Sequence, residues 1–225
     1  FFNSRAEVTG NSFLSVNLQN DKNISNERDF YESNLIIPLL NLKKTDNVFE
    51  IGCGLGRFVN HIKDKINNYL GIDFSSNLIS MALENFKDFK NLKFQEMSAN
   101  NIENNKLLNK PPFSIIMTMG LMMYLNDEDF EYLVGKILEL SDKKSTIYIR
   151  ESISIMDYRL TLKDFYSEEL KTNYNAIYRT TKEYERLFNN YFVKDGFKLV
   201  GSDLLLKGNM VNRKETNQRY WIYRR

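Results

Sequence analysis

The stretch that decides the fold is Val48-Phe-Glu-Ile-Gly-Cys-Gly-Leu-Gly-Arg-Phe58. It opens with an apolar run of β-forming residues, continues through glycines at 52, 54 and 56, and passes into an amphipathic pattern of helical period. The order strand, tight turn, helix is typical of a loop that cradles a nucleotide. Glycine suits such a loop because it adopts backbone angles closed to other residues and lets a ligand lie directly against the main chain. The unpaired N–H groups at the start of the following helix can bind a polar or anionic atom.

The spacing of the glycines distinguishes several kinds of cofactor loop. A dinucleotide fingerprint has the form G-x-G-x-x-G, and a phosphate-binding loop has the form G-x-x-x-x-G-K-[ST]. Here the order is acidic-x-G-x-G-x-G, beginning at Glu50. This pattern resembles the first motif of the class I S-adenosylmethionine-dependent methyltransferases. The resemblance implies that Glu50, Gly52, Cys53, Gly54 and Gly56 hold the methionine end of that cofactor, which carries no phosphate and needs no lysine.

A second motif follows the next short strand, predicted over residues 69–73. Asp73 ends this strand, where open parallel sheets bind their ligands, and a carboxylate there can accept hydrogen bonds from two hydroxyl groups. Gly-Ile-Asp-Phe-Ser at 71–75 is similar to the family's second motif, which implies that Asp73 binds the ribose, with Phe74 beside the adenine and Ser75 as a further contact. The alternative is that Asp73 serves only as an acid at the start of the next helix.

The third predicted strand, residues 92–96, leads into Ser98-Ala-Asn-Asn-Ile102. The family usually has aspartate and alanine here, followed by a variable pair and an apolar residue. Ser98 takes the place of the aspartate, and a hydroxyl accepts a hydrogen bond less strongly than a charged carboxylate. The resemblance still implies that Ser98, Ala99 and Asn100 contact the adenine, the last two through their backbone.

The fourth predicted strand, Phe113–Met119, runs into Gly120 and an apolar stretch with Tyr124 before a helix predicted over residues 128–140. Family members with such an apolar strand end and an aromatic before the helix are typically small-molecule methyltransferases. The resemblance implies that Met119 and Gly120 back the sulfonium and that Tyr124 lies at the cofactor. The Asn/Asp-Pro-Pro-Tyr and Pro-Cys signatures of nucleobase methyltransferases are absent from the sequence.

A fifth strand, predicted over residues 145–150, is followed by an insertion at 153–179 that is rich in tyrosine and charge. A connection of this length is typical of a lid or recognition element, and we predict a helical lid. Arg150, Arg159 and Arg179 are predicted to grip a phosphate or carboxylate together, because guanidinium groups match these anions bidentately. A solvated helical face with incidental charges is the alternative.

Glu151 and Tyr178 are the candidate general bases for an acceptor that must lose a proton. His61, the only histidine, falls on a helix predicted to face away from the cleft. A salt bridge within the loop is the alternative role for the charges at 150 and 151. Catechol-type family members bind a divalent metal through carboxylates at the ends of the fourth and fifth strands. Met119 and Arg150 stand there instead, so we expect no catalytic metal.

The flanking segments complete the predicted domain. Residues 1–25 are polar and asparagine-rich and are predicted to form an extended arm, whereas residues 26–42 have helical spacing. The family commonly has such a helix across the cofactor opening, so that Tyr31 either reaches the substrate or packs in the core. Two β-rich stretches at 197–206 and 218–223 match the family's closing antiparallel hairpin. We therefore predict one Rossmann-like α/β domain over 26–225, with helices on both faces of a seven-stranded, mostly parallel sheet whose last strand is antiparallel.

Composition limits the class of protein. The 225 residues are 42% hydrophobic and 27% charged, typical of one ordinary globular domain, and the formal net charge of +2 predicts no nucleic-acid partner. The single cysteine fits a reducing compartment, and no apolar run reaches the length of a membrane span, so we predict a cytoplasmic protein. The chain begins with Phe1 rather than methionine, which suggests a piece of a longer protein. The sequence does not indicate the oligomeric state.

Together these features predict a methyltransferase that uses S-adenosylmethionine and acts on a small molecule. The arginines favour an anionic acceptor, phosphorylated or sugar-linked, such as a precursor of a surface glycan. Two alternatives remain open: a non-catalytic module that uses the same fold to bind the cofactor or a partner, and a methyltransferase for RNA or protein.

Overall fold

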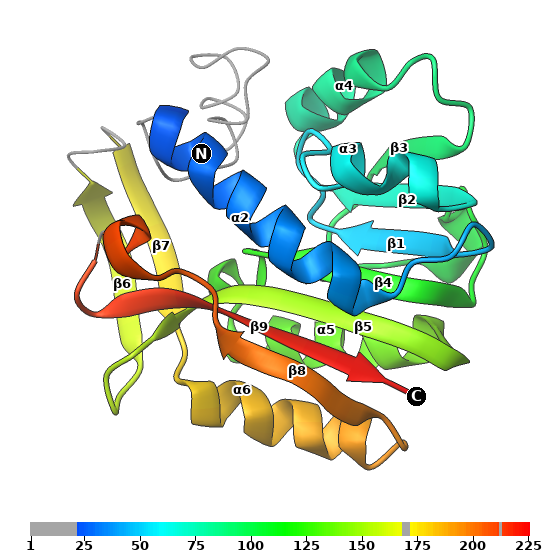
Figure 1. The fold of residues 1–225 in the computed structure, drawn as a ribbon. Helices are drawn as coiled ribbons and strands as arrows, with labels where there is room; N and C mark the ends of the chain where they lie inside the picture. The colour runs from blue at the N-terminus through cyan, green and yellow to red at the C-terminus, as the bar shows by residue number, and fades with distance from the viewer. Residues whose placement is uncertain (1–21, 168–171, 212) are drawn as a thin grey trace.

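A computed structural model describes residues 22–167, 172–211 and 213–225. Its main sheet has seven strands in the order β3-β2-β1-β4-β5-β9-β8 (Figure 1). The strands are β1 Asn47–Ile51, β2 Asn68–Asp73, β3 Leu92–Glu96, β4 Phe113–Met119, β5 Ser141–Ser154, β8 Lys198–Leu204 and β9 Thr216–Arg224. The first five are parallel to one another, and β9 runs antiparallel to both of its neighbours. This confirms the predicted Rossmann-like sheet with an antiparallel last strand.

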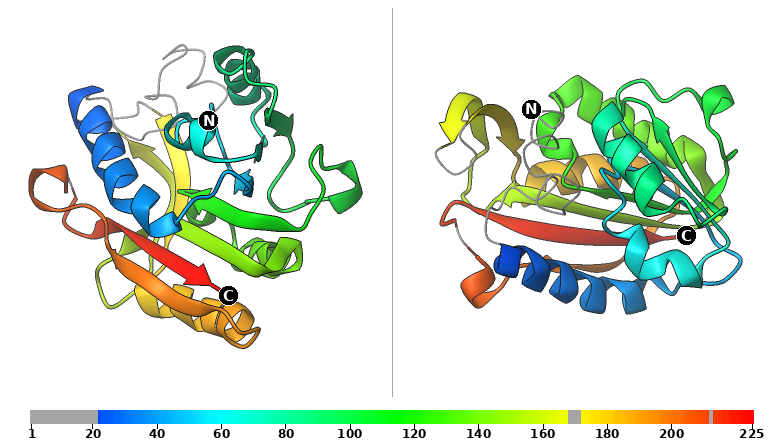
Figure 2. Two further views of the ribbon diagram at one scale, coloured as in Figure 1. Left: turned by 45° about the vertical axis from the view of Figure 1, so that its right-hand side comes forward. Right: turned by 90° about the horizontal axis from the view of Figure 1, so that it is seen from above.

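Helices cover both faces of the sheet, as Figure 2 shows. The α-helices are α2 Lys22–Leu40, α3 Val59–Ile62, α4 Ser76–Asn85, α5 Asp127–Leu140 and α6 Thr181–Phe188. Short helical turns are η2 Lys63–Lys65, η3 Asn104–Lys106, η4 Met122–Tyr124, η5 Asn189–Val193 and η6 Gly208–Met210. The apolar sides of α5, α6 and η5 share one core cluster, and those of α2, α3 and α4 share the other. The sheet is thus buried on both faces, which explains its nearly continuous apolar strands.

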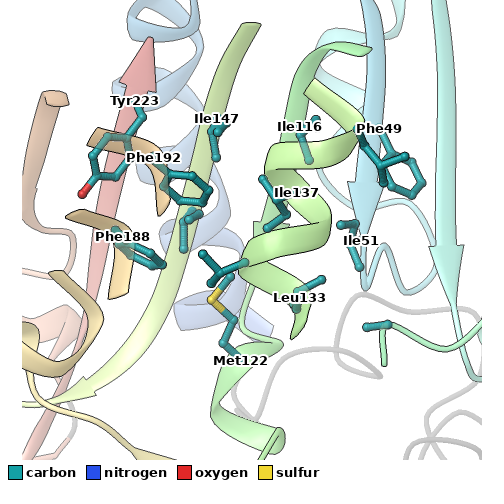
Figure 3. Close-up of a cluster of buried hydrophobic side chains, with 14 of the residues drawn as sticks. Phe49, Ile51, Ile116, Met122, Leu133, Ile137, Ile147, Phe188, Phe192 and Tyr223 are labelled. Carbon is teal, nitrogen blue, oxygen red and sulfur yellow. The ribbon is translucent and has the colours of Figure 1, made fainter. Parts of the chain in front are cut away.

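The core under α5 fixes where β1, β4 and β5 end. Ile51, Ile116 and Ile147 from the sheet lie with Leu133 and Ile137 of α5 in one cluster, and none of the five exposes any surface (Figure 3). Burial of each such side chain stabilises the fold by about 1.5–3 kcal/mol. The strand ends, and the loops that follow them, therefore rest on a closely packed support.

Two helices differ from their predicted bounds. Helix α2 begins at Lys22, so the last residues of the predicted arm are helical, and the rest of that arm lies outside the described residues. The helix predicted after the glycine loop is limited to α3 and η2, because the chain must turn back to begin β2 at Asn68. Helix α5 is capped by Asn126, whose Oδ1 accepts a hydrogen bond from the Asp129 N–H at 2.8 Å. The next residue, Asp127, pairs with Arg159 and Arg179.

The prediction that the insertion after the fifth strand is helical was wrong, while its role as a lid stays a prediction. The insertion forms a two-stranded antiparallel sheet, β6 Leu160–Ser167 and β7 Thr172–Tyr178 (Figure 1). On β7, Tyr174, Ala176 and Tyr178 are buried while Asn173 and Asn175 are exposed. This alternation of period two is that of a strand with one packed face, and it overrides the helical interpretation of the charged residues before it.

Candidate active site

A cleft of about 510 Å³ opens beyond the carboxyl ends of β1, β2, β4 and β5. This is the edge at which open parallel sheets bind their ligands. Most of the predicted cofactor residues line the cleft: Glu50, Gly52, Cys53, Gly54, Asp73, Phe74, Ser98, Ala99, Met119, Gly120 and Tyr124. Three others, Gly56, Ser75 and Asn100, do not line it. The structure thus brings together residues that the sequence separates by up to 74 positions, from Glu50 to Tyr124.

The glycine loop presents bare backbone to the cleft. Gly52 and Cys53 donate N–H hydrogen bonds to the Ile72 carbonyl at 2.8 and 3.0 Å, which ties the loop to β2. Gly52 has a φ of +77°, and a Cβ there would come within 3.2 Å of Leu121. Gly56 has a different role, because a Cβ on it would lie 2.6 Å from the Phe86 ring. The last glycine of the motif therefore allows close packing beneath the loop.

Asp73 organises the middle of the cleft. One carboxylate oxygen accepts the Gly54 N–H and the other accepts the Ser75 N–H, each at 2.9 Å. Burial raises the pKa of Asp73, and these backbone hydrogen bonds oppose that shift. A carboxylate has about four lone-pair positions, so Asp73 keeps capacity for ligand hydroxyl groups. Ser75 is the N-cap of α4, accepting the Leu78 N–H at 3.3 Å, which explains why it lies outside the lining.

A further part of the cleft, beyond Asp73, is lined by Phe74, Leu78 and Met97, and we call it the slot. Phe74 exposes 54% of its surface there. Ser98 and Ala99 lie on the same wall. The Ser98 hydroxyl donates to Asn100 Oδ1 at 2.7 Å, so Asn100 orients Ser98 without lining the cleft.

At the opposite end, Glu50 lies beside the loop with 3% of its surface exposed. The Tyr69 hydroxyl donates to its carboxylate at 2.7 Å. Burial raises the pKa of Glu50 to about 7, even though this hydrogen bond favours the ionised form. Glu50 therefore changes charge near neutral pH within the cleft.

Helix α2 is fastened over this end by buried ion pairs. Arg57, which directly follows the glycine loop, pairs with Asp29 and with Glu32, the latter at 2.8 Å. Glu32 also accepts from Tyr148 at 2.8 Å and from Arg150 at 3.2 Å. These pairs hold the pKa of Glu32 below its usual value, although burial alone acts to raise it. Asp29 and Glu32 were not predicted, but their spacing of three residues places both on one helix face, a signal that the sequence does contain.

The remaining wall comes from the β6–β7 hairpin and from the segment leading into β9. Tyr174 and Tyr178 of β7 line the cleft with their hydroxyl oxygens 3.5 Å apart, and Tyr124 packs against them. Burial raises the pKa of Tyr178, so its hydroxyl is protonated at neutral pH. Arg213 also lines this wall, and its charge acts on Tyr178. Tyr174 and Arg213 were missed, although Tyr174 shares the two-residue period of Tyr178.

The structure does not place Glu151 for proton transfer. Glu151 exposes no surface, and the described lining of the cleft does not include it. Its Oε1 accepts the N–H groups of Leu121 and Met122 at 2.9 and 3.0 Å. Burial raises its pKa, opposed by these backbone hydrogen bonds. Of the two candidate bases, only Tyr178 faces the cleft.

The three predicted arginines do not form one anion site, which corrects the predicted grip. Arg150 lines the cleft, but Arg159 and Arg179 are outside the described lining and converge on Asp127, at 2.8 and 2.7 Å. The carboxylates that pair with these two arginines already accept the guanidinium hydrogen bonds that would otherwise bind a ligand anion. Tyr31 is half-buried against the core under α2, in accordance with the packing alternative.

Among the described residues, no group of three or more His, Cys, Asp and Glu side chains is placed to hold a metal ion. Among the helices of the same residues, none has the length and apolar character needed to cross a membrane.

Comparison with known proteins agrees with this geometry. Residues 48–143 match a family model described as a methyltransferase domain. Phosphoethanolamine N-methyltransferase 3 of Arabidopsis thaliana is 27% identical over 184 residues, which are 79% of this chain and 35% of the relative. Ribosomal RNA small subunit methyltransferase A of Blochmanniella floridana is 41% identical over 76 residues, 34% of this chain and 28% of the relative.

A solved structure extends the comparison to the whole fold. Phosphoethanolamine N-methyltransferase 1 of Haemonchus contortus, solved in complex with phosphoethanolamine and S-adenosylhomocysteine, superposes with a TM-score of 0.74 at 19% sequence identity. The match covers 99% of this chain and 48% of that one. The matched regions therefore cover less than half the length of each of these three proteins.

Proposed function

We propose that this chain, which has the fold of the class I S-adenosylmethionine-dependent methyltransferases and whose residues 48–143 match a methyltransferase-domain model, methylates the nitrogen of a small phosphorylated amine. The observation that carries the proposal is that the glycine loop and Asp73 line the same cleft as Tyr174, Tyr178 and Arg213. The names of the plant and nematode relatives support the same class of acceptor.

The residues present fit the cofactor. The cleft volume of about 510 Å³ lies in the range of small-molecule sites. The missing Cβ of Gly52 lets a ligand approach the loop, and Asp73 keeps lone pairs for the ribose hydroxyls. We assign the adenine to the slot at Phe74, Ser98 and Ala99, and the amino-acid end to the surroundings of Glu50. When bound, S-adenosylmethionine supplies a methyl group on a positively charged sulfur.

The acceptor wall favours nitrogen over oxygen. An alcohol would need a strong base close by, and among the described residues that line the cleft there is no histidine. An amine needs only to lose its ammonium proton, which it can do to water before it enters. Tyr174 and Tyr178 then offer hydroxyl groups that accept an N–H hydrogen bond from the neutral amine, and ring faces that attract the positive charge that develops on its nitrogen during methyl transfer. The protein's main contribution is to align the amine and to exclude water.

Arg213 is the residue we assign to the phosphate. It lines the acceptor wall beside Tyr178, and guanidinium groups bind phosphate oxygens bidentately. Arg57 and Arg150 lie at the α2 end of the cleft, where both pair with Glu32. The sugar-linked acceptor and a role in surface-glycan precursors stay predictions.

The test combines cofactor binding with methyl transfer. Calorimetry with S-adenosylhomocysteine measures the first, and transfer of a labelled methyl group to phosphoethanolamine or to ethanolamine measures the second. We expect the protein to bind S-adenosylhomocysteine and to transfer the methyl group to phosphoethanolamine. Transfer to ethanolamine should be at least about tenfold lower, because one charge-assisted contact is lost.

Arg213→Gln should raise the KM for phosphoethanolamine about tenfold and leave S-adenosylhomocysteine binding unchanged. Lys214→Gln, which removes a neighbouring exposed charge outside the cleft, is the matched control.

Two results would point elsewhere. Cofactor binding without transfer to any small amine or alcohol would favour the non-catalytic module. Uptake of the methyl group into RNA rather than into amines would favour the activity named in the ribosomal RNA relative.

A further inference from the structure

The acceptor side of the cleft depends on one turn, residues 120–125, which we call the acceptor turn. It connects β4 to α5 and includes the short helical segment η4, Met122–Tyr124. Five of its six residues line the cleft: Gly120, Leu121, Met123, Tyr124 and Leu125. Three residues of 3₁₀-helix are too short to hold their own geometry, so this turn needs support from outside.

Glu151 supports the amino end of the turn. Its Oε1 accepts the N–H groups of Leu121 and Met122 at 2.9 and 3.0 Å, and the side chain has no exposed surface. Strand β5 supplies this residue, 30 positions further along the chain than Leu121. The carboxylate therefore acts as a distant cap on N–H groups that the short segment leaves unpaired.

Arg179 supports the carboxyl end. It donates to the carbonyl oxygens of Met122 and Leu125 at 2.9 and 2.8 Å, with only 1% of its surface exposed. Its guanidinium also pairs with Asp127 at 2.7 Å and lies 4.5 Å from the centre of the Phe130 ring. Because Arg179 directly follows Tyr178, the same residue joins the turn to the tyrosine wall of the hairpin.

The charges of the two residues match the polarity of the turn. The N–H end of a helical segment carries partial positive charge and the carbonyl end partial negative charge. The buried acid Glu151 lies at the N–H end of the turn, and the buried Arg179 lies at its carbonyl end. Neither residue is included in the described lining of the cleft.

We propose that Glu151 and Arg179 are positioning residues that hold the acceptor turn from its two ends and thereby set the place of Tyr124 opposite Tyr174 and Tyr178. The proposal goes beyond the proposed function by naming residues that control acceptor geometry. It rests on that function only for its kinetic readout, because the hydrogen bonds exist without any ligand.

Hydrogen exchange tests the support at Glu151 without cofactor or acceptor. Glu151→Gln keeps an oxygen that can accept both N–H groups, whereas Glu151→Ala removes it. We expect the Leu121 and Met122 amides to exchange at least about tenfold faster in the alanine variant than in the glutamine variant. The Gly52 and Cys53 amides, bonded to Ile72, serve as internal controls and should not change. Equal exchange of Leu121 and Met122 in the two variants would overturn the proposal.

Kinetics then separates positioning from proton transfer. A general base at position 151 would make both variants inactive and would remove one limb of the pH profile. Positioning predicts that Glu151→Gln keeps kcat within about threefold with an unchanged pH profile, while Glu151→Ala loses roughly tenfold or more because the reacting groups are misplaced. An inactive but folded Glu151→Gln protein that still binds S-adenosylhomocysteine would overturn the proposal.

Arg179 has a matched control in Arg159. Both pair with Asp127, but only Arg179 reaches the carbonyl groups of the turn. Arg179→Lys cannot bridge the Met122 and Leu125 carbonyls, so it should lower kcat roughly tenfold while S-adenosylhomocysteine affinity stays the same. Arg159→Ala should change kcat less than about twofold. Equal effects of the two changes would contradict the proposal.

If wild-type protein transfers no methyl group at all, the proposed function fails. The hydrogen-exchange experiment at Glu151 still decides the present inference, because it needs no methyl transfer.

Discussion

The two ends of the cleft are built in different ways. The glycine loop of the cofactor end lies within one strand-loop-helix unit, and its Gly54 contacts Asp73 of the next strand across 19 residues of sequence. The acceptor turn lies between β4 and α5, and Arg179 contacts its Met122 across 57 residues. The loop is specified mainly by backbone shape, whereas the turn is held by long-range hydrogen bonds between side chains and backbone.

This difference determines how each end responds to substitution. At the cofactor end the backbone itself is the binding surface, so a change there alters the fold and the ligand site together. At the acceptor end the lining residues are carried by a short turn, and the residues that hold that turn lie behind it. The two ends can therefore be perturbed separately, and the following predictions use that property in order of decreasing effect.

The largest effect is expected at the last glycine of the loop. Gly56 has a φ of +84°, and a Cβ there would lie 2.6 Å from the Phe86 ring. Gly56→Val should destabilise the fold by about 4 kcal/mol, from the unfavourable φ and from the steric overlap combined. Denaturant unfolding measures the change.

A second glycine provides the control for this prediction. Gly208 also has a positive φ, of +57°, but a Cβ on it would meet nothing within 4 Å. Gly208→Ala should therefore cost only about 1 kcal/mol, the backbone contribution alone. Similar losses in the two variants would show that packing beneath the loop is unimportant.

The next effect is a pH dependence of stability that originates at Glu50. Burial raises its pKa from 4.5 to about 7 in the folded protein. A carboxyl group with a raised pKa binds its proton more tightly when folded, so its contribution to stability is fully present below pH 4.5 and is lost as the pH rises through 7. The difference amounts to about 3 kcal/mol at most, at 1.36 kcal/mol for each pH unit.

Glu50→Gln isolates this contribution. The variant should lose less stability than wild-type protein between pH 5 and pH 8.5, because glutamine has no charge to bury. Unfolding curves of both proteins at the two pH values, without ligand, give the comparison. Parallel changes in the two proteins would mean that Glu50 titrates normally in the fold.

The third effect concerns binding at the cofactor end alone. Asp73→Ala removes the acceptor of the Gly54 and Ser75 N–H groups and of the proposed ribose hydrogen bonds. Affinity for S-adenosylhomocysteine should fall about thirtyfold, or roughly 2 kcal/mol, as for the loss of hydrogen bonds to a charged group. Calorimetry measures it, and Glu151→Gln, at the other end, should bind with wild-type affinity. If Asp73→Ala bound S-adenosylhomocysteine with wild-type affinity, Asp73 would not be part of the cofactor site.

The same difference between the two ends explains what could be predicted from the sequence. The glycine motif and Asp73 follow from local patterns, and the mostly parallel seven-stranded sheet follows from the family resemblance. Gly52, Gly54 and Asp73 line one cleft in the structure. The proposed roles of Glu151 and Arg179 could not be predicted. The local sequence around a charged residue at a strand end is the same whether its side chain faces a ligand or binds a distant turn. The hairpin was mistaken for a helical lid because its two-residue alternation is short and is interrupted between Leu162 and Phe165 by a register shift.

The smallest effect is expected at Tyr31, where the sequence left two roles open. The structure places this residue half-buried against the core under α2 and outside the described lining of the cleft, whereas Arg28, Asp29 and Glu32 of the same helix face the cleft. If Tyr31 only packs, Tyr31→Phe keeps the ring and should change the acceptor KM and kcat by less than about twofold. Methyl-transfer kinetics at saturating cofactor gives both constants. A selective rise in KM would mean that α2 also contributes to the acceptor end, so that the two ends are less separate than their contacts indicate.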